Sequence, residues 1–184
     1  MKCALPIPAD MDERYHISMI RYKLAKTPLL NGLTAEQMDS FCRLATPCSF
    51  DADEMIFEQN QYAEYLYILL SGEVVIRFKP EDGGLLTIAK LSDGEVFGWS
   101  SVLGKAIYTS GAMSTTACEC ARVRGRDIQS LCQSHPDTGI IIMERLAAVI
   151  ADRLTHTNEQ ILHLLSQNLD VQGECMRRRK DVIS

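Results

Sequence analysis

A loop able to cup a phosphate is the first piece of chemistry that this sequence offers. The stretch DGEVFGWSSVLGKAIYTSGAMS, Asp93 to Ser114, places Gly94 and Gly98 close together before residues that can open a short helix. Glycine lets the backbone approach a ligand, and the free amide groups at a helix start point toward an anion. However, no arginine follows in this stretch, and Trp99 stands beside the second glycine. A phosphate site, the remnant of one and a pocket for another ligand all stay open.

Other catalytic and metal-binding patterns fail on spacing. The run from Gly98 to Lys105 is superficially like a P-loop, but five residues separate Gly98 from Gly104, and Ala106 stands where Ser or Thr should hold magnesium. His156 and His163 are seven apart on one predicted helix face and could share a metal across a dimer, but exposed or hydrogen-bonded histidines are favoured. No Ser-His-Asp or Cys-His order stands out. The sequence therefore predicts no enzyme, no cofactor and no metal.

Composition limits the class of protein. The chain has 184 residues, 46% of them hydrophobic, and a formal net charge of −5, which suits one domain with a core and an appended helix and argues against a nucleic-acid partner. No apolar run approaches the roughly 20 residues that span a bilayer, and the N-terminus is no signal peptide. We therefore expect a cytoplasmic protein with no membrane partner. Its seven cysteines form no CxxC pair and are expected to be reduced, with Cys118 and Cys120 packed on one face of a strand.

Helices are predicted before a β-rich region. Apolar residues at helical spacing predict an amphipathic helix over 11–26, and Thr34 with Gln37 forms a capping box that starts a second helix, which Pro47 stops. From Pro47 to Val123, short apolar runs alternate with turn residues, as in a sandwich or barrel. The predicted strands are Met55–Phe57, Tyr65–Leu70, Val74–Phe78, Leu85–Leu91, Val96–Phe97 and Ala117–Val123.

The end of the chain is predicted to be helical again. A short helix is expected over Asp127–Cys132, and a long one from Pro136 to about Asn168, whose apolar stripe outlasts a small β domain. We expect this helix to pair with its copy in a homodimer, and a solvated helix folded back on its own domain is the alternative. The predicted organisation is a loose tail over 1–10, a domain over 11–135, a dimerisation helix over 136–169 and a basic tail over 170–184.

Three blocks of the sequence resemble the cyclic nucleotide-binding domain family, found in catabolite-activator-type regulators, cyclic-nucleotide-dependent kinases and gated channels. The blocks are Phe57–Asn60 with Tyr65–Val74, then Leu91–Gly98, then Thr116–Val123, and the resemblance covers about residues 30–154. It implies an α+β fold: a β-roll, or jelly roll, of short antiparallel strands with N-terminal helices and a long C-terminal helix. Turns with positive φ are expected at Gly72, at Gly94 and at Asn60, where the family usually has glycine.

The resemblance also implies a ligand-binding cassette, but with two departures. Its candidate residues are Gly98, Trp99, Ser100, Ser101, Lys105, Ile107, Tyr108 and Thr109. In the family, a glutamate after the cassette glycine accepts a hydrogen bond from the ribose, whereas Trp99 only donates. The family's arginine for the cyclic phosphate falls by spacing on Ile107 or Tyr108, and Lys105 is the one cation of the cassette. Each missing charge-assisted bond, worth about 1.5 to 3 kcal/mol, costs about one to two decades of affinity.

Three interpretations of the cassette stay open. It binds a flatter, more apolar ligand stacked on Trp99; it binds nothing, with Trp99 filling the pocket; or it holds a cyclic nucleotide weakly through backbone amides, Ser100, Ser101 and Thr109. The sequence predicts a regulatory or sensory ligand-binding module of unknown ligand, with altered or lost cyclic-nucleotide affinity. The alternatives are a catabolite-activator-type transcription regulator lacking its DNA-binding domain and a ligand-free scaffold for protein interactions.

Overall fold

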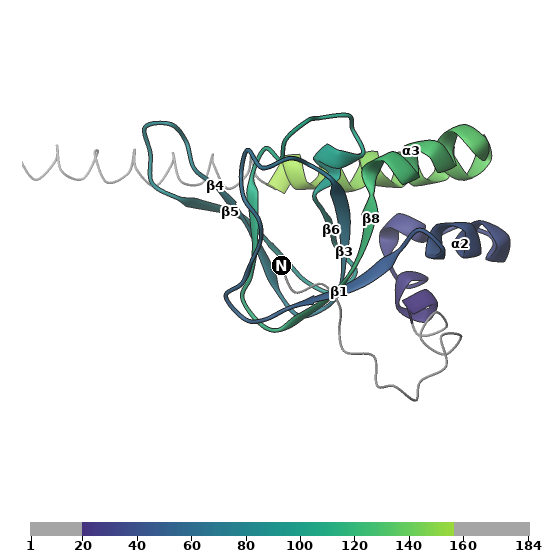
Figure 1. The fold of residues 1–184 in the computed structure, drawn as a ribbon, viewed down its shortest axis with the longest axis horizontal. Coiled ribbons are helices and arrows are strands. Elements are labelled where there is room, and N and C mark those ends of the chain that lie inside the picture. Colours follow the sequence, from purple (N-terminus) through teal and green to yellow (C-terminus); the bar gives the residue numbers. More distant parts are fainter. Residues whose placement is uncertain (1–19, 157–184) are drawn as a thin grey trace, which may run out of the picture. The chain divides into compact units, whose positions relative to one another are not determined.

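The computed structural model of the chain describes residues 20–156. After a helical segment over 20–24 and the short helix η1 (Pro28–Leu30), helix α2 (Ala35–Cys42) leads into the strands. The strands are β1 (Thr46–Phe50), β2 (Met55–Phe57), β3 (Tyr65–Ser71), β4 (Val74–Phe78), β5 (Leu86–Leu91), β6 (Val96–Phe97), β7 (Gly111–Ser114) and β8 (Cys118–Arg124). The short helix η2 (Trp99–Ser101) lies between β6 and β7, and α3 (Gly125–Ser134) follows β8 (Figure 1).

The strands form two antiparallel four-stranded sheets. One has the order β1-β8-β3-β6 and the other the order β2-β7-β4-β5. The hydrophobic core lies between them, because its members alternate along strands of both sheets; they include Tyr67, Leu69, Phe97 and Cys120 from the first and Phe57, Val74, Ile76 and Ala112 from the second. The predicted α+β β-roll is thus confirmed.

The second face of the first sheet is also buried. Leu66 and Ile68 of β3 and Ala121 and Val123 of β8 point away from the roll interior and are almost fully buried, on the side where α2 and α3 lie in Figure 1. A sheet buried on both faces holds its strands in register, because a slip by one residue would exchange the two faces. The cassette is connected to this sheet, because it follows directly after the edge strand β6.

All six predicted strands are present, and two further strands were missed. β2, β4 and β6 have the predicted bounds, β3 and β5 differ by one residue at one end, and β8 differs by one residue at both ends. β1 was missed because it contains Pro47, but β1 is an edge strand, where a missing N–H is tolerated. β7 was missed because it consists of Gly111, Ala112, Met113 and Ser114. These small residues give β7 no run of large apolar side chains for a sequence pattern to detect.

The N-terminal helices follow their sequence signals. The Thr34 hydroxyl accepts from the Gln37 amide at 3.3 Å, and the Gln37 side chain accepts from the Thr34 amide at 2.9 Å, so the capping box is present. Met38 and Phe41 are the buried face of α2. Of the helix expected over 11–26, residues 11–19 lie outside the described residues, and 20–24 are helical.

The C-terminal helix starts at the predicted residue. Helical backbone runs from 136 to 156, while the expected continuation over 157–168, His163 and the basic tail lie outside the described residues. The chain divides into two compact units between Val149 and Ile150. In the first unit, Ile142 and Leu146 are buried, whereas Ile140 and Met143 are exposed. Within residues 20–156 we find no helix with the length and apolar character needed to cross a membrane.

Candidate functional site: the cassette and the aromatic interior of the roll

The cassette starts with a left-handed glycine. Gly98 follows β6 with φ 75° and is the N-cap of η2. A Cβ at this position would lie 2.8 Å from the Tyr65 carbonyl oxygen and 3.3 Å from ring carbons of Tyr108 and Tyr67. Both the positive φ and the close approach of β3 require glycine here. The turn therefore starts η2 next to Tyr65, the first residue of β3.

The two cassette serines point into the protein. Ser100 and Ser101 are both buried, and the Ser101 hydroxyl donates to the Gly98 carbonyl oxygen at 2.9 Å. The Ser100 carbonyl oxygen accepts from the Lys105 amide at 3.0 Å. Trp99 is half-buried, whereas the side chains of Lys105 and Thr109 are exposed. The hydroxyl of Ser101 thus has a structural hydrogen bond within the turn.

The end of the cassette pairs with the segment before β3. The Ala63 amide donates to the Ala106 carbonyl oxygen at 3.0 Å, and the Tyr108 amide donates to the Gln61 carbonyl oxygen at 2.9 Å. The Asn60 amide in turn donates to the Tyr108 carbonyl oxygen at 2.9 Å, and Asn60 has φ 68°. This ladder fixes the direction of the side chains at 107 and 108, which must alternate as in a strand.

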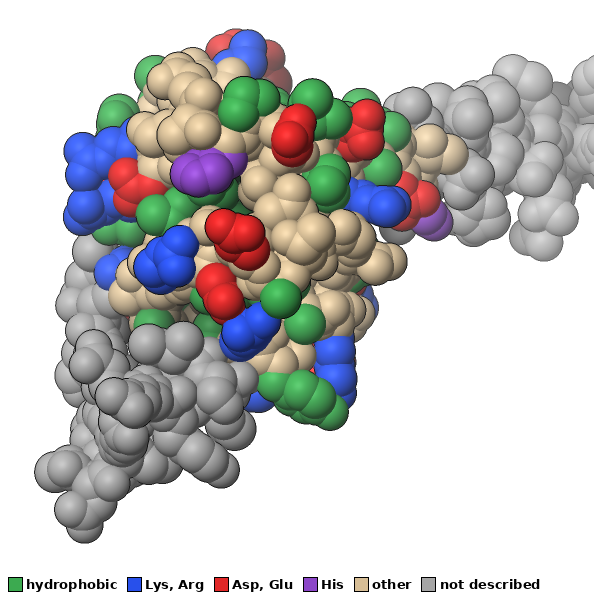
Figure 2. Space-filling model, turned by 90° about the vertical axis from the view of Figure 1, so that its right-hand side faces the viewer, with side chains coloured by type: hydrophobic (Ala, Val, Ile, Leu, Met, Phe, Trp, Pro, Cys, Tyr) green, Lys and Arg blue, Asp and Glu red, His purple; other side chains and the backbone are tan. Residues whose placement is uncertain are grey.

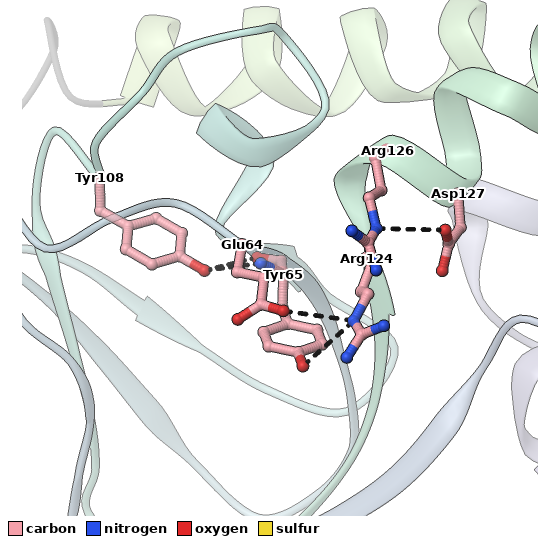
Figure 3. Close-up of polar contacts among 6 residues, drawn as sticks. All are labelled: Glu64, Tyr65, Tyr108, Arg124, Arg126 and Asp127. Carbon is pink, nitrogen blue, oxygen red and sulfur yellow. Dashed lines mark hydrogen bonds and ion pairs between the residues drawn. The ribbon is translucent and has the colours of Figure 1, made fainter.

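Tyr108 points into the roll, and its neighbour points out. Ile107 forms a bridge with Tyr62 and is 44% exposed, whereas Tyr108 is 3% exposed. The Tyr108 hydroxyl donates to the Tyr65 carbonyl oxygen at 2.8 Å and accepts from the Tyr65 amide at 3.0 Å (Figure 3). Its ring stacks on Phe57 with centroids 3.8 Å apart. Burial raises the pKa of Tyr108 to about 12, so the phenol is neutral at physiological pH.

Aromatic rings fill the interior next to Gly98. Tyr67 stacks on Phe97 with centroids 5.1 Å apart, and both rings lie within 6.0 Å of Phe57. Burial raises the pKa of Tyr67 well above the ordinary tyrosine value. Such stacked rings bury much apolar area and add about 0.5 to 1.5 kcal/mol per pair. The space directly beside Gly98 is therefore occupied by aromatic side chains.

One arginine on this side is paired with a carboxylate. Arg124, at the end of β8, forms an ion pair with Glu64 at 3.2 Å, and its Nε donates to the Tyr65 hydroxyl at 3.4 Å (Figure 3). The Tyr65 hydrogen bond is the main cause of the raised pKa of Arg124. Arg124 therefore holds the outer end of Tyr65, while Tyr108 holds its backbone.

The cassette is in direct contact with α3. A Cβ on Gly125, the first residue of α3, would lie 2.1 Å from the Ser101 carbonyl oxygen, so glycine is required for this approach. The Gln129 side chain donates to the Val102 carbonyl oxygen at 2.8 Å. The cassette and α3 are thus joined by one close backbone approach and one hydrogen bond.

Comparison with known proteins now identifies this architecture. Residues 47–135 match the model of the cyclic nucleotide-binding domain. The cAMP-activated global transcriptional regulator CRP of Pasteurella multocida is 28% identical over 141 residues, which are 76% of this chain and 63% of that protein. Over residues 47–135 the chain thus resembles the cyclic nucleotide-binding domain family, in sequence and in fold. It spans a little under two thirds of the length of the curated relatives that it matches first.

Solved cyclic nucleotide-binding domains share the fold. A cyclic nucleotide-binding domain from Methylobacillus flagellatus superposes with a TM-score of 0.71 at 20% identity, covering 80% of this chain and 83% of that one. The Thermus thermophilus Catabolite Activator Protein superposes with a TM-score of 0.63 at 28% identity, covering 76% of this chain and 63% of that one. The resemblance indicated by the three sequence blocks is confirmed.

Compared with the pattern of this family, the chain has an unusual cassette interior. The sequence left Ile107 and Tyr108 open as the position of the family's arginine, and in the structure Tyr108 is the one directed toward Gly98. Trp99, which was expected to stack on a ligand or fill the pocket, is half-buried and is not a member of the hydrophobic core cluster, whereas Tyr108 and Tyr67 are.

Sequence reasoning did not assign the rings of Phe57, Tyr65, Tyr67 and Phe97 to the site. The alternation of Tyr65 and Tyr67 on β3 was the available signal, since residues two apart on a strand share a face. The expected turn residues Gly72 and Gly94 have φ of 101° and 86°. Cys118 and Cys120 are buried in the core as predicted, and no metal-binding group of three His, Cys, Asp or Glu residues occurs within 20–156.

Proposed function

We propose that the chain is a regulatory ligand-binding module of the cyclic nucleotide-binding type whose cassette has little affinity for cAMP or cGMP. The observation that carries the proposal is the position of Tyr108, which lies beside Gly98 with its hydroxyl bonded to Tyr65. This phenol carries no charge, and its hydroxyl already donates one hydrogen bond and accepts another, so it cannot replace an arginine as a phosphate ligand. The ring also occupies volume beneath the cassette.

The other cassette groups do not supply the missing charge. Lys105 is the single cation among residues 98–109, and its side chain is exposed. Trp99 offers an indole N–H where a carboxylate would accept from a ribose hydroxyl. A lysine ammonium also binds phosphate as a point charge, without the paired geometry of arginine. The backbone amides of η2 then remain as the cassette's means of holding a cyclic phosphate.

Two double variants test the proposal. Restoring a carboxylate and an inward arginine with Trp99→Glu and Tyr108→Arg should raise affinity for cAMP by about tenfold or more, because two charge-assisted bonds are regained. Trp99→Glu with Ile107→Arg is the matched control, since it adds the same groups but directs the arginine to solvent. Calorimetry compares them, and circular dichroism checks that both are folded. Equal gains in the two variants would contradict the assigned role of Tyr108.

A homodimer is the state that the C-terminal helix favours. In residues 136–149, the side chains of Thr138, Ile142 and Leu146 are buried, and on another face Ile140 and Met143 are exposed with Ala147. Three apolar residues at positions i, i+3 and i+7 form a stripe that a second copy of the helix can cover. A regulator of the catabolite-activator type would use such a dimer, which makes this the second candidate function.

The remaining partner predictions stay part of the proposal. Figure 2 shows acidic and basic side chains interspersed on the face that it presents, without a large patch of either sign, and the chain has a net charge of −5. Both features disfavour phosphate backbones as partners. We therefore propose a cytoplasmic regulator that does not bind nucleic acid and is not an enzyme. Retention on DNA at low salt would contradict this.

A further inference from the structure

A second cleft lies apart from the cassette helix. It has a volume of about 460 Å³ and is bounded by β1, β2, the loop before β3, β3 and β8. Of the cassette residues 98–109, Tyr108 alone lines it. The volume falls in the range of small-molecule sites, which is roughly 300 to 1,000 Å³. The cleft is thus large enough for a ligand that does not touch Gly98 or Trp99.

One arginine at this cleft lacks an anionic partner. Arg122 is half-buried on β8, with its guanidinium carbon 4.4 Å from the centroid of the Tyr65 ring. Its Nε is buried and makes no hydrogen bond, and no ion pair within residues 20–156 involves this side chain. Arg124, two residues later on the same strand face, is paired with Glu64. A buried donor without a partner costs about 1 to 3 kcal/mol of folding free energy.

The cleft walls define the body of the ligand. Phe50, Ile56, Phe57 and Tyr67 line the cleft with apolar surface. Tyr67 also interacts electrostatically with Arg122, and burial raises its pKa, so its hydroxyl keeps the proton that it could donate to an anion. Aromatic walls favour a flat or branched hydrocarbon body over a sugar.

The charges around the cleft define the head of the ligand. Glu54, Glu58 and Glu64 also line it, and only Glu64 has an arginine partner. These carboxylates disfavour a dianion such as phosphate more strongly than a monoanion, because the repulsion grows with the charge of the ligand. The fork of N–H donors on a guanidinium matches a carboxylate. We propose that this cleft is a binding site for a small organic monocarboxylate with a flat apolar body, and that Arg122 holds its carboxylate.

This inference goes beyond the proposed function, because it concerns a different site. The cleft would hold its ligand whether or not the cassette binds a cyclic nucleotide. A saturating concentration of cAMP should therefore leave carboxylate binding by the wild type unchanged.

The test is a fluorine NMR titration of the full chain with 4-fluorobenzoate and, separately, with the neutral isostere 4-fluorobenzamide. The benzoate should bind at least about tenfold more tightly, which corresponds to one charge-assisted contact. Arg122→Gln should weaken benzoate binding by about tenfold or more and leave benzamide unchanged. Arg77→Gln, on β4 and outside the cleft, is the control and should bind like the wild type.

Several outcomes would overturn the proposal. They are equal binding of the two probes by the wild type, no binding of benzoate at millimolar concentration, and benzoate binding that survives Arg122→Gln. Competition by inorganic phosphate at an equal concentration would show a general anion site and would refute the monocarboxylate class. Because the two probes are compared on the wild type, the test does not depend on the stability of the variant.

Discussion

The phenol of Tyr108 completes the hydrogen bonding of Tyr65. β6 pairs with β3 at Tyr67 and Ile68, so its ladder ends before Tyr65 is reached. The Tyr108 hydroxyl bonds both the carbonyl oxygen and the amide of Tyr65, at 2.8 and 3.0 Å. One hydroxyl from the end of the cassette thus takes the place that a neighbouring strand would occupy, and it fixes the start of β3.

Removing this hydroxyl should destabilise the fold. Tyr108→Phe leaves the amide and carbonyl of Tyr65 without their shared partner, which costs about 1 to 3 kcal/mol of unfolding free energy. Urea denaturation measures the loss. Tyr62→Phe is the control, because Tyr62 is 71% exposed and should change stability little. Equal effects of the two substitutions would show that the Tyr108 hydroxyl has no structural role.

Stability should fall at high pH in a way that depends on Tyr108. Burial raises its pKa from 10.0 to about 12, so the folded state holds its proton more tightly than the unfolded chain. The stabilisation is fully present below pH 10 and is lost as the pH rises toward 12. Melting temperatures between pH 9 and 11.5 should therefore drop less steeply for Tyr108→Phe than for the wild type. The decline should be reduced rather than abolished, because the pKa of Tyr67 is raised as well. Parallel curves would contradict the prediction.

Alanine substitutions at two glycines of the cassette distinguish the cost of a left-handed backbone from the cost of a steric clash. Gly98 and Gly104 both have positive φ, 75° and 71°. An added Cβ at Gly104 meets no atom within 4 Å, but at Gly98 it would lie 2.8 Å from the Tyr65 carbonyl oxygen. Gly104→Ala should cost about 1 kcal/mol, the price of the left-handed conformation, and Gly98→Ala clearly more. Thermal denaturation compares them, and a smaller loss at Gly98 would refute the close packing of the cassette on β3.

The fold was predictable because its signals are local, whereas the site depends on side-chain directions. The capping box of Thr34 and Gln37 and the apolar runs of β2, β4 and β6 are complete within a few residues of sequence. The choice between Ile107 and Tyr108 depends instead on pairing with residues 60–63, which no local pattern specifies. β7 was missed as well, since its small residues form no run of large apolar side chains.

Substitution of one exposed alanine tests whether the chain forms a homodimer through its C-terminal helix. Ala147→Glu places a charge in the apolar stripe of Ile140 and Met143 and should shift a dimer toward monomer at micromolar concentration. Ala52→Glu makes the same chemical change at an exposed turn between β1 and β2 and should have no effect. Sedimentation velocity reports both. A monomeric wild type, or a dimer that tolerates Ala147→Glu, would rule out association through this stripe.

Calorimetric titration of the unmodified protein with cAMP tests the central claim most directly. In the proposed function, Tyr108 and Trp99 take the places of the family's arginine and ribose acceptor, which leaves the amides of Trp99 and Ser100 to hold the cyclic phosphate. Losing both charge-assisted contacts removes about two decades of affinity or more. We predict a dissociation constant well above the micromolar range for cAMP, and likewise for cGMP. Submicromolar binding of cAMP by the wild-type chain would contradict this account of the cassette.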